Sequence, residues 1–138
     1  MEDLKYNDAT RNRPDGERLL DAPVISLHLN ATIAQLKGEA SYEKNDRNAI
    51  TLFHSEHMRI VLIALHAGAE MAEHKATGPC SILAIDGRVE VRAGLDSYPL
   101  GPGEAVALQD AVAHSVKADG ESVILLTMAA GVKSGDRF

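Results

Sequence analysis

The chain has 138 residues, of which 45% are hydrophobic and 25% charged, a composition typical of one ordinary globular domain. Its 14 basic and 20 acidic residues give a net charge of −6, and no stripe of Lys and Arg occurs, so nucleic acid is not an expected partner. The longest aliphatic run, Ile60–Leu65, is too short to cross a bilayer, so no membrane partner is expected either.

Two features of the sequence bear on the cellular compartment. The opening residues Met1-Glu2-Asp3 are mostly acidic, and no apolar signal-peptide core follows them. The single cysteine, Cys80, excludes an internal disulfide and suits a reducing environment. We therefore expect a cytoplasmic protein.

The first 22 residues are polar, are broken by Pro14-Asp15-Gly16 and show no sustained hydrophobic period. Residues 1–22 are predicted to form an N-terminal tail or arm, which if ordered would lie against a partner subunit. Residues 23–138 are predicted to form a single domain whose core spans 49–128.

The beginning of that domain is predicted to hold one edge strand and one short helix. Val24–Leu29 has the composition of a strand. Asn30 is a good N-cap for a helix that runs to Lys37, and Gly38 then supplies a left-handed stop. No other helix of note is expected.

From Ala49 onward, short apolar segments alternate with turn residues, which is typical of a β-sandwich or a closed barrel. Asp86-Gly87 is a strong hairpin signal, because both residues adopt positive φ readily. The run Arg59–Leu65 is apolar on both faces, so a helix or a partner must cover the face outside the barrel. The expected strands are Ala49–Phe53, Arg59–His66, Met71–His74, Cys80–Ile85, Val89–Arg92, Ser97–Leu100, Ala105–Leu108, His114–Lys117 and Ser122–Met128.

Two motifs, each built around one histidine, lie within these strands. The first begins at Gly68, reaches His74 and closes at Gly87, and the second begins at Gly103 and reaches His114. This spacing resembles the two motifs of the cupins, G-x(5)-H-x-H-x(3,4)-E-x(6)-G and G-x(5)-P-x-G-x(2)-H-x(3)-N. The resemblance implies an all-β double-stranded β-helix, that is, a jelly-roll cupin barrel with a short N-terminal helix.

Several positions of the cupin motifs carry other residues in this chain. The second histidine of the first motif falls on Ala76, and its glutamate falls on Cys80. In the second motif the proline, the glycine and the asparagine fall on Gln109, Ala111 and Ala118.

The resemblance implies a metal held by four ligands in the barrel mouth, of which only His74 and His114 remain. A divalent transition metal such as Fe, Zn, Ni or Mn is therefore the less favoured expectation, because metal sites generally offer three or four protein ligands. A Cys80 thiolate would make a His-His-Cys site, which suits zinc, iron or copper. The favoured interpretation of Cys80 is a small buried hydrophobic residue.

Side chains alternate along a strand, so even-numbered positions from 74 to 84 are predicted to share the barrel interior. His74, Ala76, Cys80 and Ile82, together with His114, would then line a mainly apolar cavity with two imidazoles at its mouth. Such a cavity is by default a pocket for a small molecule.

The other candidate ligands are weaker. His66 shares the parity of His74 and is a possible third ligand, and Glu70 or Glu73 could replace the missing carboxylate. His54 and His57 are expected at the surface, on a hairpin tip.

The chain also resembles a group of small bacterial cupins without an assigned reaction, in Gly78-Pro79, in the segment 114–118 and in Leu125-Leu126-Thr127. The first hypothesis is a non-catalytic or metal-poor protein that binds a small, mainly apolar molecule. The alternative is a metal-dependent enzyme of dioxygenase, isomerase or decarboxylase type that uses His74 and His114. A third hypothesis is a purely structural dimer. A homodimer is expected because the predicted helix is too short to cover the outer apolar face.

Overall fold

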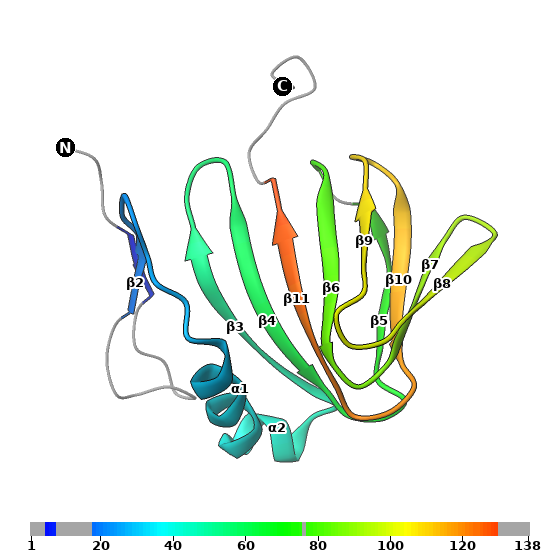
Figure 1. Cartoon of the computed structure of the whole chain (residues 1–138), viewed down its shortest axis with the longest axis horizontal. Coiled ribbons are helices and arrows are strands. Elements are labelled where there is room, and N and C mark those ends of the chain that lie inside the picture. The colour runs from blue at the N-terminus through cyan, green and yellow to red at the C-terminus, as the bar shows by residue number, and fades with distance from the viewer. Residues whose placement is uncertain (1–4, 8–17, 76, 130–138) are drawn as a thin grey trace.

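The computed structural model describes residues 5–7, 18–75 and 77–129 (Figure 1). Strands dominate it, with two helices near the beginning of the chain. In chain order the elements are β1 (Lys5–Asn7), β2 (Arg18–Asp21), α1 (Leu29–Gly38), α2 (Ala40–Lys44), β3 (Arg47–His54), β4 (Arg59–Leu65), β5 (Glu70–Lys75), β6 (Cys80–Asp86), β7 (Val89–Ala93), β8 (Asp96–Leu100), β9 (Ala105–Leu108), β10 (Ala113–Ala118) and β11 (Ser122–Met128).

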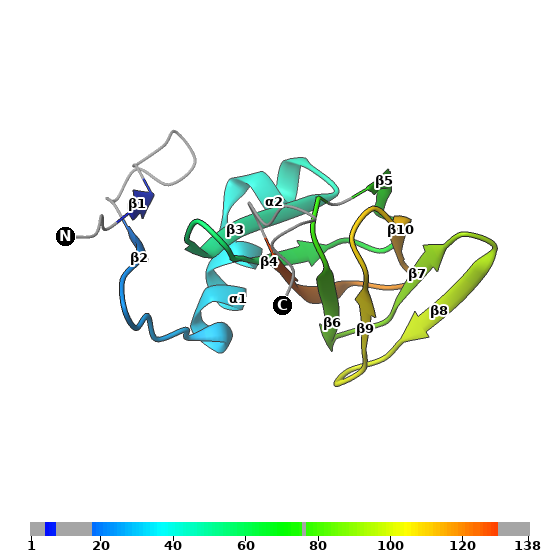
Figure 2. The same cartoon turned by 90° about the horizontal axis from the view of Figure 1, so that it is seen from above.

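Two antiparallel sheets face each other and enclose the core (Figure 2). One has the order β3-β4-β11-β6-β9, and the other has the order β5-β10-β7-β8. Strands far apart in the chain are neighbours in space, as β4 with β11 and β5 with β10, which is the connectivity of a jelly roll. The predicted all-β barrel with a short helix is confirmed.

The barrel core lies between the two sheets and follows the predicted alternation. On β6 the even-numbered residues Cys80, Ile82 and Ala84 are buried, whereas the odd-numbered residues between them are half-buried. Val61 and Ile63 of β4 pack into the same interior cluster as Ile82. The predicted interior parity of positions 80, 82 and 84 therefore holds.

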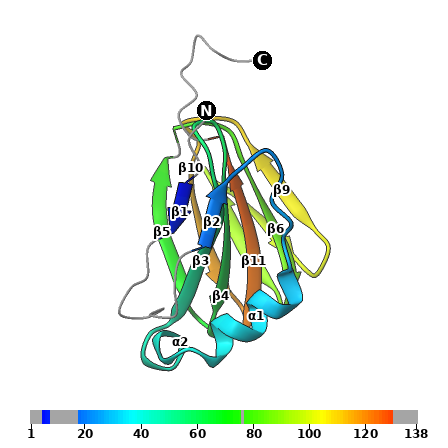
Figure 3. The same cartoon turned by 90° about the vertical axis from the view of Figure 1, so that its left-hand side faces the viewer.

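A second apolar layer covers the outer face of the five-stranded sheet. Leu62 and Ala64 of β4 point to this face and pack with the fully buried Leu36 of α1. Asn48 of β3 fastens the end of that helix, because its Nδ2 donates hydrogen bonds to Leu36 O at 3.0 Å and to Glu39 Oε1 at 2.8 Å. Figure 3 shows α1 and α2 beside the sheet. A helix thus covers part of β4, as its two apolar faces required.

The N-terminal expectations were partly wrong. Val24–Leu29 is not a strand, and α1 already begins at Leu29, with His28 rather than Asn30 at the N-cap. Thr32 rather than Asn30 supplies a local side-chain hydrogen bond, from its hydroxyl to His28 O at 2.8 Å. A second helix, α2, follows directly, because Glu39 is extended and lets the chain turn between the helices. Within residues 1–22, β1 and β2 pair, and β2 contacts β3 of the same chain.

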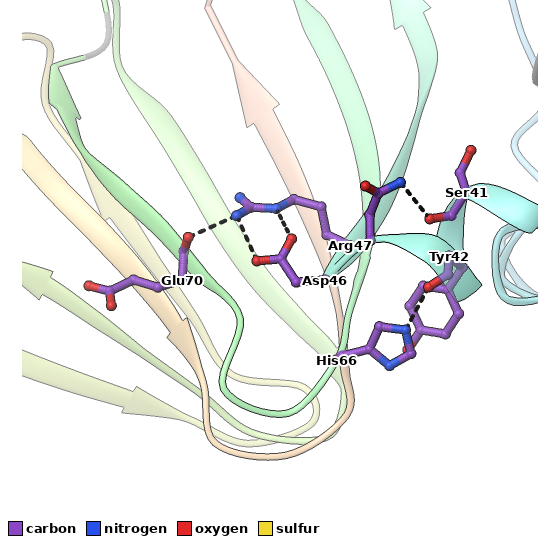
Figure 4. A network of polar contacts seen from close by, with 7 residues as sticks. Ser41, Tyr42, Asp46, Arg47, His66 and Glu70 are labelled. Carbon is purple, nitrogen blue, oxygen red and sulfur yellow. Dashed lines mark hydrogen bonds and ion pairs between the residues drawn. The ribbon is translucent and has the colours of Figure 1, made fainter.

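One end of the barrel is closed by a network of polar contacts beside α2 (Figure 4). Arg47 pairs with Asp46 at 3.0 Å and donates a hydrogen bond to Glu70 O at 2.9 Å, which ties β3 to β5 and so joins the two sheets. This hydrogen-bonded Arg47 guanidinium lowers the pKa of Asp46. His66 stacks on Tyr42 with ring centroids 3.8 Å apart, and its Nε2 donates a hydrogen bond to Tyr42 O at 2.7 Å.

In the described part of the chain, no helix is long and apolar enough to span a membrane.

Candidate functional site in the barrel mouth

His74 and His114 face each other at the other end of the barrel, where β5, β9 and β11 finish, at the top of Figure 1. This end is called the mouth below. The two residues are cross-strand partners on β5 and β10, and their ring centroids lie 4.5 Å apart. His114 is only 2% exposed, whereas His74 is open to solvent. The structure therefore brings together the two histidines that the motifs singled out.

Both imidazoles are oriented by the backbone. Nδ1 of His114 lies 3.0 Å from Val112 O, and Nδ1 of His74 lies 3.4 Å from Ala72 O. A carbonyl oxygen only accepts, so Nδ1 is the donor in both contacts, and the corresponding neutral tautomer has its lone pair on Nε2. The pair can accept hydrogen bonds from a ligand or donate electron pairs to a metal.

The row that holds the histidines continues across the four-stranded sheet. His114 pairs with Ala93 of β7, and Ala93 pairs with Asp96 of β8. Cross-strand partners share a face, so the exposed Asp96 carboxylate belongs to the same interior face as the imidazoles. It lies two strands from His114, about 10 Å at the usual strand spacing.

The five-stranded sheet supplies the opposite row of the mouth. Met128 of β11 pairs with Cys80 of β6 on one side and with Arg59 of β4 on the other. Cys80 pairs in turn with Leu108 of β9. This row is apolar at its centre and charged at the β4 end.

The described residues do not fit the metal site that the motifs imply. No group of three or more His, Cys, Asp or Glu side chains among them is placed to hold a metal ion. Ala76 lies outside the described residues. Burial raises the pKa of the Cys80 thiol, which favours the uncharged form over the thiolate that a metal would need.

The weaker candidate ligands lie elsewhere or at the surface. His66 is at the closed end, where Nδ1 approaches Glu121 Oε2 at 3.3 Å and Nε2 contacts Tyr42, so it cannot join His74. The shared even number with His74 was misleading, because the interior residues of β4 are the odd-numbered ones, and His66 follows the far end of that strand. Glu70 and Glu73 are exposed on β5, and His54 and His57 are exposed around the β3–β4 turn, as expected for the hairpin tip.

The backbone explains which motif positions are retained. Gly68, Gly87 and Gly103 all have positive φ, and a Cβ at Gly87 would collide with Glu121 O. Ala111, at the position of the motif glycine before His114, also has positive φ, at 63°. A left-handed conformation is unfavourable for alanine. The loop before His114 thus has the backbone conformation expected for a glycine at position 111, and the alanine there is strained.

A pocket of about 440 Å³ lies where β6, β9 and β11 reach the mouth, and its lining includes Cys80, Leu108 and Met128 of the interior row. Ser81, Ala107 and Thr127 form one cross-strand row of it, on the face opposite to Ile82. Met58 is also at its margin, but neither His74 nor His114 lines it. This external pocket thus reaches the apolar row of the mouth without contacting the histidine pair.

Comparisons with known proteins were made at the levels of sequence and of fold. No protein-family model matches the chain, and no curated protein matches it in sequence. Solved structures do match. The protein TT1209 from Thermus thermophilus is 28% identical, with a TM-score of 0.61 over 71% of this chain and 93% of that one. A cupin superfamily protein from Desulfitobacterium hafniense is 17% identical, with a TM-score of 0.60 over 62% and 79% of the two chains.

A larger enzyme matches in the same way. A variant of salicylate 1,2-dioxygenase from Pseudoaminobacter salicylatoxidans is 16% identical, with a TM-score of 0.67 over 86% of this chain and 36% of that one. Together with the sheet order, these similarities show that this protein has the cupin fold. Since fold alone does not fix function, the activity must be argued from the mouth itself.

Replacing Ala111 by glycine tests the strain before His114. Ala111→Gly is expected to raise the free energy of unfolding by about 0.5–1 kcal/mol, because the relief of left-handed strain exceeds the added chain entropy. Urea unfolding measures it. Ala113→Gly, the same change inside β10, is the control and should destabilise the protein. A lower stability for Ala111→Gly would contradict the assignment of strain.

The raised pKa of Cys80 predicts slow alkylation. At pH 8 the folded protein should react with iodoacetamide much more slowly than urea-unfolded protein, because the thiolate is the nucleophile and burial disfavours it. The rate should keep rising above the ordinary thiol pKa as the pH increases. Mass spectrometry of the single cysteine measures the rate. Equal rates for folded and unfolded protein would show that the thiol is accessible and ionises normally.

Proposed function

We propose that this cupin binds a small organic molecule in its barrel mouth and does so without a stoichiometric metal ion. The observation that carries the proposal is the pair of imidazoles at the mouth, oriented by backbone carbonyls and unsupported by a third described ligand. In the tautomer that these contacts favour, Nε2 of each ring can accept a hydrogen bond from a ligand. The apolar row of Met128, Cys80 and Leu108 suits its hydrocarbon part.

The second candidate function is a metal-dependent enzyme of dioxygenase, isomerase or decarboxylase type. The orientation of His74 and His114 supports it, because metal-bound histidines usually donate their second ring nitrogen to a carbonyl or carboxylate. A dioxygenase among the structures of similar fold supports it as well. It requires further ligands beyond this pair.

Metal content separates the two functions. Protein purified without chelator or metal-binding tag should carry well under one equivalent of iron, zinc, nickel or manganese, measured by elemental analysis after dialysis. One equivalent that survives dialysis, and that is lost in both His74→Ala and His114→Ala, would overturn the proposal in favour of the enzyme. The outer-face variant Ser115→Ala serves as the control.

We also propose that the protein acts as a cytoplasmic homodimer. Helix α1 contacts β3 and β4, and the outer face of the sheet beyond them is less covered. Leu83 there is only half-buried, Ala105 and Ala107 are exposed, and the external pocket is hollowed beside them. A second copy is the simplest cover for such a face, since two-fold dimers are the commonest soluble oligomers.

Sedimentation at micromolar concentration should give twice the monomer mass of 14.8 kDa. Ala107→Arg should shift the protein towards monomer, because it places a long charged side chain in the external pocket. Ser115→Arg, on the outer face of the other sheet, is the matched control and should remain dimeric. A compact wild-type monomer would reject the dimer.

A further inference from the structure

The charged group on the apolar side of the mouth is Arg59, at the start of β4. Arg59 has the same parity as Val61 and Ile63, which pack in the barrel core. Its Nη2 donates a hydrogen bond to Thr51 Oγ1 at 3.4 Å, and Thr51 is the cross-strand partner of Val61. Both observations place the guanidinium on the interior face of the sheet, not on its outside.

Arg59 has no carboxylate partner among the described residues. Its long hydrogen bond to Thr51 uses one of five N–H donors, and the side chain is exposed. Two other described arginines do have a carboxylate partner: Arg47 pairs with Asp46, and Arg92 pairs with Glu90. A guanidinium with donors to spare at a site that binds small molecules is suited to a carboxylate, which it can hold by two parallel hydrogen bonds.

The opposite side of the mouth carries the opposite charge. Asp96 on β8 ends the row that begins at His74. Figure 2, which looks at the protein from above, shows β4 and β8 on opposite sides of the barrel. An anionic ligand would be repelled from the β8 side and attracted to the β4 side, so the two charges fix its direction in the mouth.

We propose that the ligand is a small organic carboxylate whose anionic group binds Arg59. Its apolar body lies against Met128, Cys80 and Leu108, and a hydroxyl or amine on it can donate to Nε2 of His74 or His114. This inference rests on the proposed small-molecule function and adds the chemical class of the ligand. Arg59 is thereby the residue that selects anions over neutral molecules of the same shape.

Benzoate and benzyl alcohol are a matched pair of probes, because they share a ring and differ in charge. Binding to the full chain is followed by NMR titration of the amide signals of Cys80, Leu108 and His114. Wild-type protein should bind benzoate more tightly than benzyl alcohol. Arg59→Gln should weaken benzoate about tenfold, the change expected for one charge-assisted hydrogen bond, and leave benzyl alcohol unchanged. Arg59→Lys keeps the positive charge but loses the two parallel hydrogen bonds, so it should retain only part of the preference.

The control is Arg92→Gln, which removes an arginine from the outer face of the other sheet and should not alter either probe. Unchanged amide spectra away from the mouth show that each variant is folded. Equal binding of both probes, unaffected by Arg59→Gln, would overturn the carboxylate assignment and leave small-molecule binding intact. Absence of binding by both probes at the mouth of the wild-type protein would instead overturn both the proposed function and this inference.

Discussion

The five-stranded sheet must bury both of its faces, and the rest of the structure depends on this constraint. On β4, Val61, Ile63 and Leu65 enter the barrel core, whereas Leu62 and Ala64 enter the layer beneath the helices. Each buried aliphatic side chain contributes about 1.5–3 kcal/mol, so neither face can be left in water without a large loss. The barrel needs the second sheet on one side and α1 on the other, and α1 needs Asn48 and Leu36 to hold its end against β3.

Because both sheet faces are apolar, polar side chains gather at the two ends of the barrel, and the two ends differ in how far these side chains are paired. At the closed end, Arg47 pairs with Asp46 and the β5 backbone and His66 bridges Tyr42 and Glu121, although the buried Tyr42 hydroxyl has no hydrogen-bond partner among the described residues. The proximity of Glu121, added to desolvation as the larger cause, raises the pKa of Tyr42. These groups stabilise the connection between the sheets. At the mouth, polar groups retain free hydrogen-bonding capacity, which is why the mouth rather than the closed end is the candidate site.

The chain matches the cupin motifs at some positions and not at others, and the backbone explains the pattern. Gly68, Gly87 and Gly103 serve turns with positive φ, so replacing them would cost folding energy whatever the barrel binds. Cys80, at the glutamate position of the first motif, lies in β6 and carries no such backbone requirement, so this position could change without loss of the fold. Ala111 lies between these cases, since it has the positive φ of a glycine although alanine stands at the glycine position of the motif. The spacing of the motifs therefore predicts the fold, but it does not predict which residues stand at the metal-ligand positions.

The sequence was enough to predict the barrel, the interior parity of β6 and the place of His74 and His114 at the mouth, because these follow from local alternation and motif spacing. It wrongly predicted a hairpin at Asp86-Gly87, where β6 and β7 in fact belong to different sheets and, of these two residues, only Gly87 has a positive φ. It mispredicted Val24–Leu29, where apolar composition was taken for a strand although the segment leads into α1, and it gave no sign of α2. Only the tertiary structure placed His66 at the closed end and brought Arg59 and Asp96 to opposite sides of the mouth. Alternation along a single strand decides which face of the sheet a side chain occupies. Its position along the barrel axis and its neighbours depend on the register between strands that are far apart in the chain.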